Sequence, residues 1–293
     1  MENKELKTDN RKYSSRKKML KRFFRNRMTI VGLVIVAAVL LLAVFAELIV
    51  PFPDSNTIAV NFKMMNKPPS SLNLFGTDEI GRDVLSRTIY GARYSLMMAG
   101  VVLTIAVIIG VPLGLVAGYY GGVVNSVIMR ITDVFLAIPS LILALTVAAI
   151  LEPSLMNSMI AISFGWWPWF TRLTQAETLK IKNEQFILSS EGIGASKMRI
   201  MFSEILPNCL PTIIVKISTD VGFVILTGAS LGFLGLGAQP PTPEWGTMIS
   251  EARVYLPTVW WSSVFPGLAI LLTILGFSFL GDGIRDAFDV RAQ

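Results

Sequence analysis

Residues 28–50 read MTIVGLVIVAAVLLLAVFAELIV, an apolar run that carries one charged residue, Glu47, near its end. A helix needs about 20 apolar residues to cross the hydrocarbon core of a bilayer. The run is longer than the roughly 7 to 15 apolar residues at the centre of a secretory signal peptide. It therefore predicts a first transmembrane helix over residues 28–50. A cleaved signal peptide is the alternative, and Val44-Phe-Ala46 resembles a cleavage site only loosely.

The segment before this run is strongly basic. Residues 1–27 hold eleven Lys and Arg against three acids, so this head contributes +8 whereas the whole chain carries +6. A basic tail is one mark of nucleic-acid binding, but here it directly precedes a membrane helix, and cytoplasmic flanks of such helices are rich in Lys and Arg. We therefore expect 1–27 to be a basic cytoplasmic segment, and no nucleic acid among the partners.

Composition indicates that most of the chain lies in lipid. Apolar residues make up 53%, charged residues only 16%, and the mean hydropathy is +0.59. The single cysteine excludes a disulfide within the chain, and the absence of histidine removes the commonest metal ligand and general base. We expect no metal site, no catalytic residue and no cofactor on this chain, and membrane lipid as its surroundings.

Five further runs free of charge are long enough, or nearly so, to cross a membrane. Backbone groups in lipid need internal partners, and the ten-residue alternation of a barrel is missing from the sequence, so the spans are expected to be helical. The predicted fold class is an all-α integral membrane protein with six transmembrane helices. Besides residues 28–50, the runs are Tyr94–Met129, Val134–Leu151, Pro153–Thr171, Val221–Pro243 and Val254–Gly281.

With the basic head inside, the order of the spans sets the rest of the topology. Residues 51–93 form an extracytoplasmic loop, in which the spacing of apolar residues over Gly81 to Ser95 predicts an amphipathic helix on the membrane surface. Residues 94–293 form the core domain of five spans. Its loop 174–207 falls on the cytoplasmic side, as do both chain termini.

A polar stretch interrupts this apolar core. Residues 188–208 read LSSEGIGASKMRIMFSEILPN. Gly194 permits a turn without steric cost, so the pattern predicts a short helix, a turn, and a second helix with an apolar face that ends in a proline opening the next span. The members of that face are Met198, Met201, Phe202 and Ile205. An exposed loop of this kind is a candidate docking surface.

The same stretch resembles the coupling loop, called the EAA loop, of ABC-transporter permeases. Gly194, Leu206 and Pro207 stand in register with that motif, whereas Leu188 replaces its glutamate and two serines replace its alanines. The resemblance implies that a separate ATPase binds here. The residues that it implies for ATPase coupling are Leu188, Ser189, Ser190, Glu191, Gly192, Gly194, Ala195, Ser196, Leu206 and Pro207.

Further stretches resemble the dipeptide, oligopeptide and nickel branch of the binding-protein-dependent permeases. They are GTDEIGRDVLSRTIYGAR at 76–93, LGFLGLGAQPPTPEWG at 231–246, FPGLAI at 265–270 and GDGIRD at 281–286. The resemblance implies the type I importer permease fold in a bacterial cytoplasmic (inner) membrane. It also implies a heterodimer with a second permease subunit, two ABC ATPase subunits that hold ATP and magnesium, and an extracytoplasmic substrate-binding protein. A Gly-Lys phosphate-binding loop is missing from this sequence.

Two pairs of charged residues lie in or beside predicted spans, at helical spacing. Charges there are costly, so each is expected to meet a partner or water. The pairs are Arg130 with Asp133, and Lys216 with Asp220. We expect Asp133, Lys216 and Asp220 as candidates for the translocation path, with a structural ion pair of Lys216 and Asp220 as the favoured alternative.

Three other groups of residues complete the sequence-based expectations. Gly110, Gly114 and Gly118 predict a helix face for close packing. The tryptophans near span ends predict interfacial anchors without a ligand. Contact with the binding protein is expected from the outer segments that hold Asp78, Arg82, Asp83, Pro241 and Trp245.

The predicted function is that of a permease subunit of an ATP-driven importer of di- and oligopeptides, which is not itself an enzyme. The same machinery importing nickel chelates or another small solute is one alternative. An ion-coupled secondary transporter is another, and it would call for inverted repeats and broken helices with ion ligands.

Overall fold

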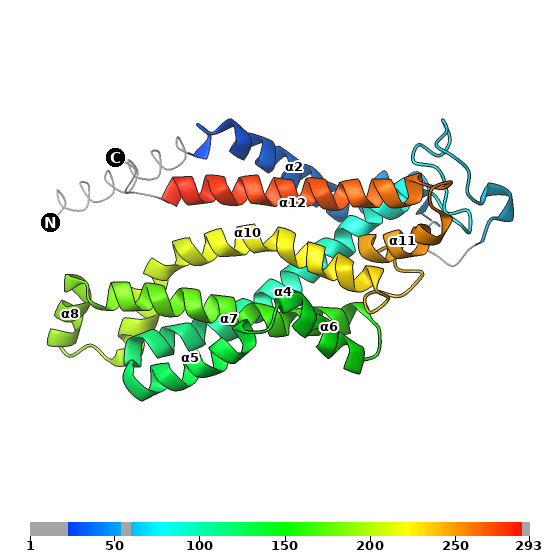
Figure 1. The fold of residues 1–293 in the computed structure, drawn as a ribbon. Coiled ribbons are helices and arrows are strands. Elements are labelled where there is room, and N and C mark those ends of the chain that lie inside the picture. Colours follow the sequence, from blue (N-terminus) through cyan, green and yellow to red (C-terminus); the bar gives the residue numbers. More distant parts are fainter. Residues whose placement is uncertain (1–22, 54–59, 289–293) are drawn as a thin grey trace.

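The structure is a computed structural model that describes residues 23–53 and 60–288 (Figure 1). Within these residues all regular elements are helical, and a single isolated bridge pairs Thr77 with Asp83. The all-α class is thus confirmed. The helices are α2 (Arg27–Val44), α3 (Ala46–Ile49), η2 (Phe62–Met64), α4 (Val84–Tyr120), α5 (Gly122–Leu136), α6 (Ser140–Ile150), α7 (Leu155–Lys182), α8 (Gln185–Gly192), α9 (Lys197–Arg199), η3 (Ile200–Ile205), α10 (Leu206–Phe233), α11 (Trp245–Ala252), η4 (Arg253–Tyr255) and α12 (Trp261–Phe288).

The long helices account for the predicted spans with shifted bounds. By length and composition α2, α4, α12 and the stretch Lys197–Phe233, which contains α10, can each cross a membrane, and α5 with α6 can form a fifth span bent by 83°. α7 is the remaining long helix, with 28 residues, and its second half is polar. The arrangement is compatible with six spans.

Two packed pairs of helices build the bundle (Figure 1). α2 lies along α12, where a Cβ on Gly32 or Gly276 would collide with the facing helix. α4 crosses the molecule and packs along α7, where a Cβ on Gly110, Gly114 or Gly118 would collide with α7. The glycine face predicted for close packing is confirmed, because only hydrogen side chains leave room for this approach.

The predicted surface helix at Gly81 to Ser95 is not a separate element. α4 begins at Val84, capped by the Asp83 carboxylate at 2.8 Å from the Ser86 amide, and continues unbroken for 37 residues, or about 55 Å. Its first turns are buried against the preceding loop and α11. Helical spacing alone does not tell which partner covers a helix face.

The bounds of the polar loop and of the fifth span also differ from those that charge-free windows predict. The coupling loop was expected to begin at residue 174, but α7 continues to Lys182. The charge-free window of the fifth span begins at Val221, but α10 begins at Leu206 with Pro207 in its first turn, which agrees with the expectation that this proline opens the span. Charge-free windows end at the first charged residue, whereas a helix continues wherever its polar residues find water or partners.

Candidate functional site

The loop between α7 and α10 forms the first candidate site, at the left end of the molecule in Figure 1. α8 ends in a glycine-dependent motif: Gly194 has φ +80°, its amide donates to Glu191 O at 3.0 Å, and the Ala195 amide donates to Ser190 O at 3.0 Å. These two hydrogen bonds together form the Schellman motif, in which the residue with left-handed backbone angles directly follows the C-cap of the helix. The turn predicted at Gly194 is confirmed.

The loop exposes apolar side chains on a polar segment. Leu188 is 54% exposed and Ile193 is 86% exposed, whereas the neighbouring Ile187 of α8 is fully buried. The coupling residues that the sequence singles out from Leu188 to Ser196 lie together on this one projection, and Ser196 caps α9 through the Arg199 amide. Exposed apolar residues rimmed by polar ones mark a protein-binding surface.

The segment after Gly194 departs from the predicted amphipathic helix. Ile200–Ile205 is a π-helix that runs directly into α10. Met201 and Ile205 are buried, but Met198 and Phe202 are exposed. The prediction of one apolar face for all four residues is wrong, because the wider π-turn rotates the later residues relative to α-helical spacing.

Polar contacts join this loop to the ends of α4 and α7. The Tyr119 hydroxyl donates to Glu191 at 3.2 Å, and Lys182 Nζ donates to Tyr119 O at 2.6 Å. The Lys197 ammonium lies 5.4 Å from the centre of the Tyr120 ring. The loop is therefore tied to the packed pair of α4 and α7.

A second candidate site is a set of charged residues on α5, α7 and α10. Lys216 Nζ lies 2.8 Å from Asp220 Oδ1 and 5.5 Å from the centre of the Trp169 ring. Asp133 forms an ion pair with Arg172 of α7, not with Arg130. Arg172 and Asp133 are both about half exposed, whereas Asp220 is buried.

Sequence reasoning missed Arg172 and Trp169 in this set. Arg172 directly follows a charge-free run and looks like the start of a loop, and Trp169 has the position of an interfacial anchor. Because α7 extends beyond both residues, they stand within a helix instead and face the charged residues of α5 and α10. Arg172 and Asp133, like Trp169 and Lys216, are too far apart in sequence for a local pattern to predict that they meet.

The end of the molecule opposite α8 contains α11 and the loop before α4, is called the outer end below, and holds a buried network of charges. Arg82 Nε lies 2.6 Å from Asp78 Oδ2, and Arg87 Nη2 lies 3.1 Å from Glu251 Oε2 on α11. Arg87 also donates to Pro241 O at 3.2 Å, and the indole of Trp245 donates to Thr88 O at 2.9 Å. These bonds fasten the loop before α4, the start of α4 and α11 to one another.

The residues expected to meet a binding protein lie within or beside this network. The side chains of Asp78, Arg82, Asp83 and Trp245 are buried inside the chain, and Pro241 is partly buried. Their contacts hold the outer end together, so any surface that these segments offer comes from their exposed neighbours. Glu251 was not singled out from the sequence, because a lone acid on a short helix carries no motif.

Glu244 is the most deeply buried acid of this region. Its Oε2 accepts from the Thr247 amide at 2.9 Å and from the Thr247 hydroxyl at 3.3 Å, so it caps α11. It occupies the space left by Gly232 of α10, where a Cβ would lie 2.5 Å from Oε2. Burial raises the pKa of the Glu244 carboxyl, and the Gly246 and Thr247 amides oppose that rise.

A bundle of long apolar helices, with a glycine-hinged loop at one end and charges buried between its spans, defines an integral membrane transport subunit. The family model described as "Binding-protein-dependent transport system inner membrane component" matches residues 110–293. A second, described as "N-terminal TM domain of oligopeptide transport permease C", matches residues 14–69. The chain belongs to this family of binding-protein-dependent inner membrane transport components.

Curated relatives agree with this assignment. The dipeptide transport system permease protein DppC of Escherichia coli K12 is 48% identical over 92% of this chain and 91% of its own length. DppC of Alkalihalophilus pseudofirmus is 43% identical over 93% and 89%. The glutathione transport system permease protein GsiD of Pectobacterium atrosepticum is 39% identical over 93% and 90%.

A solved structure supports the fold. A chain of the MetNI methionine ABC transporter, in an inward-facing conformation, superposes with a TM-score of 0.57 at 20% identity and covers 69% of this chain and 96% of its own. The importer permease fold expected from the sequence is therefore confirmed.

Proposed function

We propose that this chain is one of two permease subunits of an ATP-driven importer that carries dipeptides and short oligopeptides into the cell by alternating access. The observation that carries the proposal is the identity of 42 to 48% to several permeases named for dipeptide transport, over about nine-tenths of each chain. Nickel chelates or another small solute are the alternative cargo. One relative is named for transport of glutathione, which is itself a short peptide.

The proposed partner at the loop is an ABC ATPase subunit. The projection formed by α8 and Gly194 offers Leu188 and Ile193 as apolar contacts, and Ser189, Ser190 and Glu191 as polar ones. ATP and magnesium are held by two such partners. Closure of the ATPases moves α8, and the contacts of Glu191 and Lys182 with Tyr119 carry that motion to α4.

The proposed translocation path runs beside the charged set on α5, α7 and α10. Half-exposed charges within membrane helices call for water or a partner. Asp133 and Arg172 are about half exposed and paired with each other. Lys216 is 30% exposed, and its partner Asp220 is buried beside it. The Trp169 ring lies next to the Lys216 ammonium. The ion pair of Lys216 and Asp220 is present, so these residues serve the path as a pair and not as free charges.

The proposed orientation places α8 and both termini in the cytoplasm of a bacterium. The start of α2, the end of α12 and α8 lie toward one end of the molecule, and α11 with the loop before α4 lies at the other (Figure 1). An extracytoplasmic binding protein delivers cargo at the latter end, and a second permease completes the path. The alternative of a different class, an ion-coupled secondary transporter, would differ from this proposal in needing no ATPase partner.

Gly194→Asp tests the coupling role. An aspartate at φ +80° costs about 1 kcal/mol or more and alters the projection that the ATPase meets. In the assembled complex in proteoliposomes, we expect the variant to be inserted normally and to lose ATP hydrolysis stimulated by the loaded binding protein.

Gly235→Asp is the matched control. Gly235 ends α10 in the same motif, with φ +82° and open space around its Cα, but lies far from the loop. It should retain stimulated hydrolysis. Equal loss in both variants, or full stimulation in Gly194→Asp, would contradict the coupling role.

A further inference from the structure

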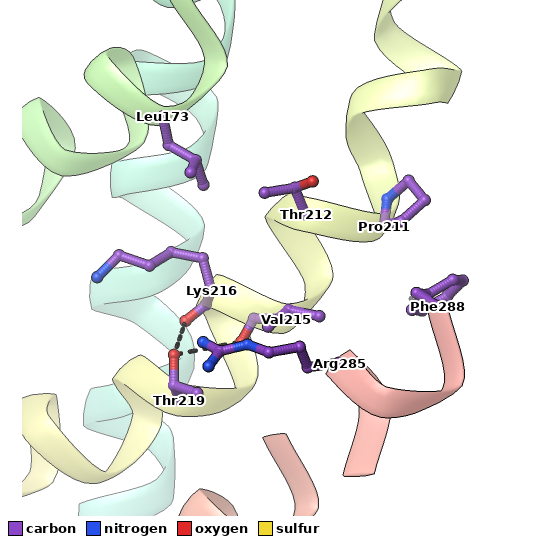
Figure 2. Close-up of a pocket in the computed structure, with 8 residues that line it drawn as sticks. All are labelled: Leu173, Pro211, Thr212, Val215, Lys216, Thr219, Arg285 and Phe288. Atoms are coloured by element: carbon purple, nitrogen blue, oxygen red, sulfur yellow. Dashed lines mark hydrogen bonds between the residues drawn. The ribbon is translucent and has the colours of Figure 1, made fainter. Parts of the chain in front are cut away.

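α10 and α12 enclose a cavity on the loop side of the Lys216–Asp220 pair (Figure 2). The two helices touch at Gly281, where a Cβ would lie 2.8 Å from Thr219 Cγ2. From this contact toward the loop they separate, and Pro211 lies inside α10 on the separating stretch. A proline within a helix bends it. The result is a wedge-shaped cavity of about 310 Å³.

The wall of the cavity combines two cations, Arg285 and Lys216, with hydroxyl groups and apolar surface. The Arg285 side chain extends from α12 toward α10, as Figure 2 shows. Arg285 is exposed and forms no ion pair with any acid in residues 23–53 and 60–288. The ammonium of Lys216, by contrast, is already paired with Asp220. The other lining residues are Leu173, Pro211, Thr212, Val215, Thr219 and Phe288.

The neighbouring acids on α12 do not face this cavity. Gly281, Arg285 and Phe288 share the face toward α10. Asp286 is instead hydrogen-bonded to Asn26 at the start of α2, at 3.5 Å. The positive charge of Arg285 is therefore offered to the cavity.

We infer that this cavity is a subsite for the carboxylate of the transported peptide on its release side. The inference rests on the proposed function. A guanidinium binds a carboxylate through two parallel N–H bonds, and the Thr212 hydroxyl in the same lining is a further donor. The apolar wall suits a small side chain. The volume lies at the lower end of the roughly 300 to 1,000 Å³ of small-ligand sites, which favours a dipeptide over a longer chain.

The position of the cavity fits release rather than entry. α10 runs from the coupling loop at Leu206 toward the outer end, so Pro211 to Val215 lie between that loop and Asp220. A peptide that has passed the charged set reaches Arg285 next on its way to the cytoplasm. Arg285 then acts as a specificity residue for the free carboxyl terminus.

The test uses the assembled importer in nanodiscs, without nucleotide and without binding protein. The probe is photo-leucyl-alanine, a dipeptide with a diazirine, and its C-terminal amide serves as the probe without a carboxylate. We expect the acid to cross-link to peptides that contain residues 211–219 or 281–288, and underivatised dialanine to compete. The amide should cross-link about tenfold more weakly, the factor expected for a lost charge-assisted hydrogen bond.

Variants show how much of the cross-linking depends on Arg285 itself and how much on the rest of the cavity. Arg285→Gln should weaken cross-linking of the acid about tenfold and leave the amide unchanged, and Arg285→Lys should fall between. Asp282→Asn, an exposed change one turn away on α12, should match the unaltered chain. Equal labelling by acid and amide in the unaltered chain would overturn the inference whether or not any variant folds.

Two further measurements identify the cause if no cross-link forms. If no cross-link forms but native mass spectrometry finds phosphatidylglycerol on the unaltered complex and not on Arg285→Gln, the cavity holds a lipid headgroup and the inference is overturned. Uptake of dialanine into proteoliposomes with binding protein and ATP tests the proposed function separately. Intact uptake without cross-linking overturns the subsite alone, whereas absent uptake overturns the function itself.

Discussion

Single residues at the outer end show how burial changes what a side chain does. Glu244 is 1% exposed and caps α11, in a space that exists because residue 232 is glycine. In the sequence it is one acid in the run PPTPEWG. Burial raises its pKa above the ordinary value of a glutamate.

Glu244→Gln should remove a pH dependence of stability. A carboxyl with a raised folded pKa stabilises the fold fully below its unfolded pKa, and this contribution is lost as pH rises through the folded pKa. The unaltered chain should therefore lose thermal stability relative to Glu244→Gln as pH increases above about 4.5. Unfolding midpoints of the two proteins in detergent, measured from pH 5 to 8, give the comparison.

Glu244→Ala is the control for capping. It removes the acceptor of the Thr247 amide as well as the charge, and should be about 1 kcal/mol less stable than Glu244→Gln at every pH. A parallel pH profile for the Gln variant and the unaltered chain would show that Glu244 titrates as it does in the unfolded state.

At the scale of elements, the pair of α4 and α7 connects the loop between α7 and α10 to the opposite end of the molecule. α4 begins in the buried charge network and ends at Tyr119 and Tyr120, which contact the loop. Its glycine face lets it approach α7 closely along the half of the helix nearer the loop. The two helices can therefore move as one body.

Gly114→Ala should disturb that pair. A Cβ there would lie 2.7 Å from Thr174 Cβ and 2.9 Å from the Gln175 amide nitrogen, so the helices must separate. Overpacking of this kind costs about 1 to 3 kcal/mol. Thermal unfolding of the purified chain in detergent should show the loss.

Gly100→Ala on the same helix separates packing from helix propensity. No atom of the described chain lies within 4 Å of a Cβ at Gly100. Alanine favours a helix over glycine by about 1 kcal/mol, so this variant should be as stable as the unaltered chain or more so. Similar losses in both variants would mean that close packing at Gly114 is unimportant.

At the scale of the whole molecule, buried charges hold distant segments of the chain together. Arg87 is 1% exposed and contacts Glu251 on α11, Asp78 before α4, and the Pro241 carbonyl. These groups are separated by up to 173 positions in sequence, from Asp78 to Glu251. These contacts therefore join the loop before α4, the start of α4 and α11 into one unit.

A double-mutant cycle measures this connection. Removing one member of a buried ion pair costs about 3 to 5 kcal/mol, because the other charge stays buried. Arg87→Gln and Glu251→Gln should each be strongly destabilising, and the double variant less so than their sum. Arg93→Gln, in the exposed pair with Glu47, should cost only about 0 to 1 kcal/mol. Additive losses at Arg87 and Glu251 would argue against a shared network.

The sequence alone predicted the class of the protein and the hinge of its loop. Charge-free length in lipid leaves a helix as the main solution, as the run at residues 28–50 shows. Gly194 lies at a position where φ is positive, and Gly110 to Gly118 recur at the spacing of one helix face. Each of these features depends on residues near one another in the chain, so its physical cause is local.

Only the tertiary structure decided which polar residues meet. Asp133 pairs with Arg172 and not with its sequence neighbour Arg130, and Arg87 meets Glu251 across the outer end. Arg285 faces a cavity because α10 and α12 separate beyond Gly281. A side chain's partner depends on how helices cross and where they diverge, and packing over the whole bundle sets that geometry.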